Sequence, residues 1–65
     1  MEPNEFIAEN VSKLSSVWWR WIKANQIAQD KNSNMAYRRY NAKEAERLIA
    51  ERYSIMEKID DYFGR

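Results

Sequence analysis

The sequence predicts an all-α fold, an antiparallel hairpin of two long helices within a chain of 65 residues. Its only proline, Pro3, and its only glycine, Gly64, lie near the two ends, so neither breaker interrupts the interior. The segment 30–34 is polar and rich in turn-forming residues, and it divides the chain in two. Because long helices joined by so short a connection run antiparallel, we expect one domain, 1–65, with helices at about 4–28 and 34–63.

The first helix is predicted from its start and from an apolar repeat. Pro3 suits a first helical turn, and Asn4 is a candidate N-cap. Apolar residues, with one asparagine, then recur at alternating spacings of four and three, which is typical of a coiled-coil-like contact. This repeat is Ile7, Val11, Leu14, Trp18, Trp21, Asn25 and Ala28. We expect it to form the helix–helix contact and Phe6, Val17 and Ile22 to widen it.

The second helix has two candidate starting points. Ser33 or Asn34 could cap a helix that continues to residue 63, whereas Asn41 followed by Glu44 resembles a capping box. We favour the long helix because residues 35–40 contain no helix breaker, and a kink near 41 is the alternative. Its expected apolar face is Ala45, Leu48 or Ile49, Arg52, Ile55 or Met56, Ile59, and Tyr62 or Phe63.

The chain carries more aromatic surface than one hairpin can bury. Trp18, Trp19 and Trp21 lie within four residues, yet successive residues on a helix point about 100° apart. Chains of this length bury a small core, and the absence of cysteine excludes a disulfide. Because each helix has an apolar face wider than one partner helix covers, we expect two hairpins to pair as a dimeric four-helix bundle.

Two residues interrupt the expected apolar faces. Arg52 lies in the middle of the second face and Asn25 lies in the first. A polar residue at such a position can fix the register or orientation of paired helices at some cost in stability. We interpret both residues in this way.

The residue types present argue against an enzyme. With no histidine and no cysteine, the chain lacks the commonest general base and a thiolate nucleophile. We find no set of metal ligands and no phosphate-binding loop, so we expect no catalytic residue, no metal, no cofactor and no small-molecule substrate. The apolar runs are too short for a membrane span or a signal peptide. We therefore expect no membrane contact and a cytoplasmic location.

Trp19 is the strongest candidate for a contact with a partner protein, because tryptophan is enriched at binding hot spots. Its neighbours on the helix surface are small or polar, namely Ser12, Ser15, Ser16, Lys23 and Gln26. With Tyr37, Arg38 and Tyr40 near the turn, it forms the predicted partner-binding surface. We interpret the chain as a small non-enzymatic regulatory module that binds itself, an unidentified protein, or both.

The charge layout supports an alternative function. Asp30 is the only acid between residues 10 and 43, so the hairpin is expected to be basic at its turn and acidic at its chain ends. Two copies could then pair antiparallel, or the basic end could bind DNA or RNA through cations interleaved with aromatic residues. The candidate nucleic-acid-binding residues are Arg20, Lys23, Lys31, Arg38, Arg39 and Lys43. No established nucleic-acid-binding motif accompanies them.

Overall fold

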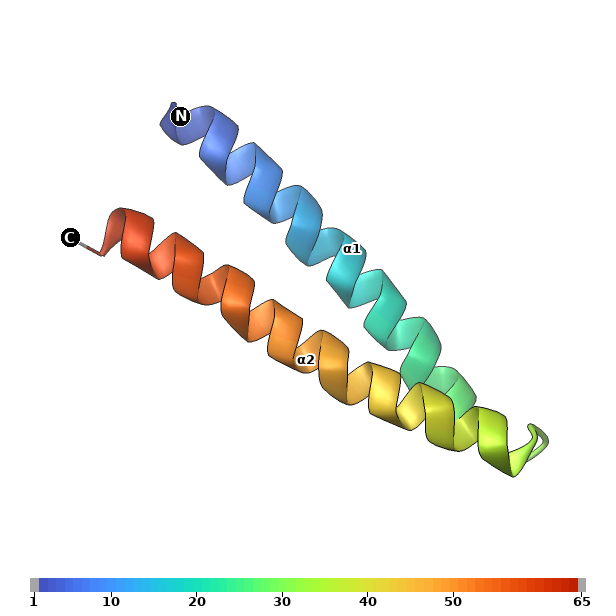
Figure 1. Cartoon of the computed structure of the whole chain (residues 1–65). Coiled ribbons are helices and arrows are strands. Elements are labelled where there is room, and N and C mark those ends of the chain that lie inside the picture. The colour runs from blue at the N-terminus through green and yellow to red at the C-terminus, as the bar shows by residue number, and fades with distance from the viewer. Residues whose placement is uncertain (1, 65) are drawn as a thin grey trace.

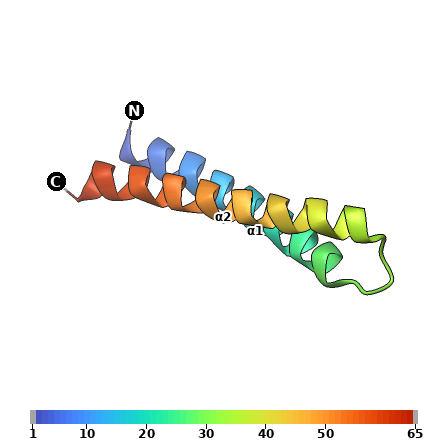
Figure 2. The ribbon, with the colours of Figure 1, turned by 60° about the horizontal axis from the view of Figure 1, so that its bottom comes forward.

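The computed structural model describes residues 2–64, which form two long helices joined by a short turn. Helix α1 spans Pro3–Gln29 and helix α2 spans Met35–Phe63. They run antiparallel, with both chain ends at one end of the molecule and the turn at the other (Figure 1). The hairpin is elongated, with extents of 47 × 17 × 12 Å, as a second view also shows (Figure 2). The predicted all-α hairpin is confirmed, and the helix bounds agree to within one residue.

The two helix starts are capped differently. Helix α1 begins at Pro3, and Glu2 occupies the N-cap position without a side-chain capping bond. Asn4 therefore lies inside the first turn, and the prediction that it caps α1 is wrong. Helix α2 has the cap expected of Asn34, whose side-chain oxygen accepts hydrogen bonds from the backbone N–H groups of Ala36 at 2.7 Å and Tyr37 at 3.4 Å. This cap satisfies two donors that have no partner inside the helix.

Helix α2 passes through Asn41 without interruption. The Asn41 side chain is buried and donates a hydrogen bond to the carbonyl oxygen of Tyr37 at 2.9 Å, one turn earlier. Asn10 makes the equivalent bond to Phe6 in α1, also at 2.9 Å. Each buried amide thus finds a partner within its own helix, and the capping-box alternative at Asn41 is excluded.

The core between the helices is narrow. Its buried apolar side chains are Val17, Ala24, Ala45, Leu48 and Ile55, with Leu14, Trp21 and Ile59 packed partly against them. At the open end, the ring of Phe6 stacks on Tyr62 with centroids 4.0 Å apart. A core this small supplies little stability. Further stability would have to come from contacts that cover the exposed apolar surface of the molecule.

The apolar repeat predicted for α1 faces α2 only in part, through Leu14 and Trp21. The residues buried against α2 are Asn10, Val17 and Ala24, each one position before a member of the repeat. Val11 and Trp18 consequently remain 56% and 51% exposed, because one residue along a helix is a rotation of about 100°. Valine and alanine let the helices approach closely, whereas an indole on the same line would hold them apart.

The prediction for α2 was more accurate. Ala45, Leu48 and Ile55 are buried, and Ile59 is half-buried, as expected. Arg52 lies at the edge of this contact and is exposed.

The Asn34 cap can be tested against a neighbouring asparagine. Asn34→Ala removes the side-chain acceptor and should lower the free energy of unfolding by about 1 kcal/mol. Asn32→Ala is the matched control, because Asn32 interacts through its backbone N–H with Asp30 rather than through a capping side chain. Urea unfolding followed by helical circular dichroism measures both variants, and equal losses would contradict the capping role.

Candidate protein-binding face

One long side of the hairpin is charged, and an ion pair crosses between the helices there. Arg20 of α1 pairs with Glu51 of α2 at 3.4 Å. Arg47 pairs with Glu51 at 3.4 Å and also with Glu44. The hydrogen bond from Arg47 lowers the pKa of the Glu44 carboxyl. We call the side defined by Arg20, Glu44, Arg47 and Glu51 the charged face. Each exposed ion pair contributes little to stability, but the charged groups keep this side of the hairpin hydrated.

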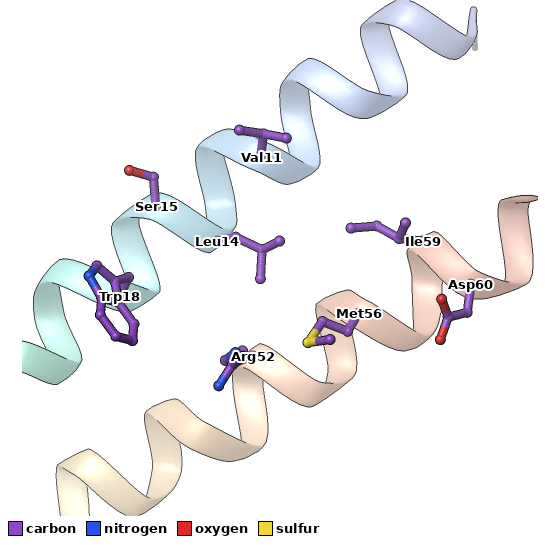
Figure 3. A pocket seen from close by; sticks show the side chains of 8 residues that line it. All are labelled: Val11, Leu14, Ser15, Trp18, Arg52, Met56, Ile59 and Asp60. Atoms are coloured by element: carbon purple, nitrogen blue, oxygen red, sulfur yellow. The ribbon is translucent and has the colours of Figure 1, made fainter.

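The opposite side holds an apolar groove of about 620 Å³. The residues lining it are Val11, Leu14, Ser15, Trp18, Arg52, Met56, Ile59 and Asp60. Figure 3 shows Leu14 and Trp18 of α1 and Arg52 of α2 directed into the space between the ribbons. Three members of the predicted repeat of α1, Val11, Leu14 and Trp18, therefore line this groove.

Exposed apolar side chains extend the groove along both helices. On α2, Ile49, Met56 and Phe63 recur at intervals of seven residues, so they share one side of the helix. Ile49 and Met56 each come one position after a buried residue of α2, just as Val11 and Trp18 each come one position after a buried residue of α1. Because the helices are antiparallel, these equal rotations bring both sets to the same side of the hairpin. We call this side the open face, defined by Ile7, Val11, Trp18, Ile49, Met56 and Phe63, which are between 40% and 56% exposed.

The predicted partner-binding residues fall into two separate places. Trp19 is 67% exposed near the middle of α1, whereas Tyr37 and Tyr40 are exposed near the start of α2. Because Arg20 pairs with Glu51, the part of α2 that lies level with Trp19 is close to Glu51. Tyr40 is eleven residues from Glu51, or about 16 Å along the helix. The structure does not bring Trp19 together with the residues at the turn.

Arg38 has a structural contact in this arrangement. Its Nε donates a hydrogen bond of 3.1 Å to the carbonyl oxygen of Ala28, near the end of α1, and the residue is half-buried. This bond satisfies one of the carbonyl groups that a helix end leaves without a partner. Arg38 thereby ties the start of α2 to the end of α1.

The predicted nucleic-acid-binding cations are also divided in their roles. Arg20 and Arg38 are engaged in contacts within the hairpin. The four others, Lys23, Lys31, Arg39 and Lys43, are exposed near the turn end of the molecule.

The part of the chain that the structure describes has no cluster of three or more carboxylate, histidine or cysteine side chains positioned to hold a metal ion. Over the same residues, neither helix combines the length and the apolarity needed to cross a bilayer. No family model matches the chain, and no curated protein or solved structure matches it.

Sequence reasoning missed two parts of this arrangement. Asp60 was not predicted as a groove residue, because the sequence places it among the acidic residues expected at the chain ends. The recurrence of Ile49, Met56 and Phe63 was visible, but each was treated as an alternative to a core residue. The seven-residue interval was the signal that could have identified a second apolar line.

The structural contact of Arg38 can be separated from surface charge with its neighbour. Arg38→Met should lower the free energy of unfolding by about 1.5 kcal/mol, because it removes a charged donor from the partly buried carbonyl oxygen of Ala28. Arg39→Met removes the same charge from an exposed side chain and should change stability by less than about 0.5 kcal/mol. Urea unfolding of both variants is the measurement, and two equal effects would contradict the assigned contact.

Proposed function

We propose that this chain is a non-enzymatic protein-interaction module that works as a homodimer joined through the open face. The observation that carries the proposal is the groove of about 620 Å³, continuous with large apolar side chains on both helices. Contiguous apolar surface of this kind on a small protein marks a site of interaction. The groove contains no pair of groups suited to acid–base or nucleophilic chemistry.

The dimensions of the molecule are compatible with a dimer. A stable interface buries about 800 Å² on each partner, roughly 15% of the 5319 Å² surface of this chain. The intrachain core contains five buried apolar side chains, two of them alanines. Covering the open face would add Trp18, Met56 and Ile49 to the buried apolar surface, and such association is a common way to stabilise small domains.

A second copy is favoured over other apolar occupants by the shape of the face. The groove is formed equally by α1 and α2 and runs along the hairpin. Two identical apolar faces can cover each other under two-fold symmetry, which is the commonest symmetry of small oligomers. The product is the dimeric four-helix bundle that the sequence suggested.

The regulatory role belongs to the surface that such a dimer leaves exposed. Trp19 does not line the groove, is 67% exposed, and would be presented once by each copy. An exposed indole is well suited to anchor a partner protein. The nucleic-acid alternative draws on only four unengaged cations of the original six, so we favour a protein partner.

The adjacent tryptophans test the proposed interface. Trp18→Ala should weaken self-association at least tenfold, about 1.4 kcal/mol, because Trp18 lines the groove. Trp19→Ala removes an equally large side chain that does not line the groove and should weaken the dimer far less than Trp18→Ala does. Sedimentation equilibrium over a range of concentrations measures both constants. A wild-type chain that stays monomeric throughout, or equal losses in the two variants, would contradict the proposal.

A further inference from the structure

We infer that the two copies dock antiparallel, with their turns at opposite ends, so that Arg52 of each copy pairs with the partner's Asp60. This inference rests on the proposed homodimer and specifies its geometry. It assigns Arg52 and Asp60 as the residues that set orientation and register. It also assigns Met56 to the two-fold axis.

The groove is lined by two charged side chains that have no ion-pair partner among the described residues. Arg52 and Asp60 both line it, and neither forms an ion pair with any residue from 2 to 64. They are eight residues apart on α2, or about 12 Å along the axis, which is too far for a direct pair. Covering the groove without neutralising these charges would be strongly unfavourable.

An antiparallel pairing of α2 with its copy removes this difficulty. In such a pairing, residues at equal distances on either side of the two-fold axis face each other. Met56 lies midway between Arg52 and Asp60, so an axis through Met56 places each Arg52 opposite the partner's Asp60. The same axis places Ile49 opposite the partner's Phe63. One register therefore neutralises both charges and matches the apolar side chains of the open face.

Helix α1 has a compatible register. Val11 and Trp18 are equally distant from a point between Leu14 and Ser15, and all four line the groove opposite Arg52, Met56 and Asp60. An axis through that point pairs Val11 with the partner's Trp18, so that a small side chain faces a large one. Ser15, at the axis, allows the two copies of α1 to approach closely.

The parallel arrangement, with both turns at the same end, lacks these matches. It would place α2 of one copy over α1 of the other at the same level, and Arg52 would face the middle of α1. Helix α1 has no acidic residue after Glu9, so Arg52 would remain unpaired. It would also bring together the chain ends of both copies, where Glu2, Glu5, Asp60 and Asp61 lie. Electrostatic complementarity therefore favours the antiparallel arrangement.

Mixing two charge-reversal variants tests the pairing. Arg52→Glu and Asp60→Arg should each weaken self-association at least tenfold, because each homodimer then opposes like charges. An equimolar mixture should form a heterodimer within about threefold of the wild-type constant, since each copy then supplies the charge that the other requires. Asp61→Arg, an exposed neighbour outside the groove, should not restore Arg52→Glu. Sedimentation equilibrium of single variants and mixtures measures all constants.

A single cysteine reports the position of the axis independently. The chain has no cysteine, so Met56→Cys introduces one thiol that should meet the partner's thiol and form a disulfide-linked dimer under mild oxidation. Tyr53→Cys, exposed on the same helix, is the control and should cross-link at least tenfold more slowly. A wild-type dimer with no rescue in the mixture and no faster cross-linking at Met56 overturns this inference but not the proposed function. A wild-type monomer overturns both.

Discussion

The close approach of the two helices along one narrow line determines which side chains this molecule can bury. Val17 and Ala24 of α1 meet Ala45, Leu48 and Ile55 of α2, and most of these side chains are small enough to let the backbones approach. Once these side chains are buried between the helices, the side chains one position later on each helix point about 100° away and cannot be buried in the same contact. The open face is thus a geometric consequence of the core.

The same constraint explains how far sequence reasoning could go. The hairpin, the turn and the Asn34 cap depend on local signals, such as the placement of Pro3 and Gly64, and they were predicted correctly. The face of α1 that meets α2 was predicted only in part, because two adjacent apolar lines compete on that helix. Leu14 and Trp21 of the predicted repeat pack against the core, whereas Val11 and Trp18 remain exposed. The more hydrophobic line contains Val11 and Trp18, yet the line with smaller side chains packs inside. Periodicity identifies an apolar line but does not say which neighbour covers it.

The site was predictable in part. The sequence identified Arg52 as an anomaly on an apolar face, and the structure places it in the groove. The significance of Asp60 could not be inferred, because it depends on the rotation of α2 relative to α1. Arg38 was grouped with surface cations, and its bond to Ala28 depends on how the turn brings the two helix ends together. In each case, the missing information was tertiary contact and not residue chemistry.

The charged face has a further consequence for the size of any assembly. Ion pairs such as Arg20–Glu51 keep that side of the hairpin polar and hydrated, whereas the apolar groove lies between other residues. A protein with two apolar sides could add copies indefinitely and grow into a filament, whereas a self-complementary contact on one side closes after the first addition. The charged face is not part of the groove, so in the proposed dimer it would lie outside the interface and the assembly would end at two copies.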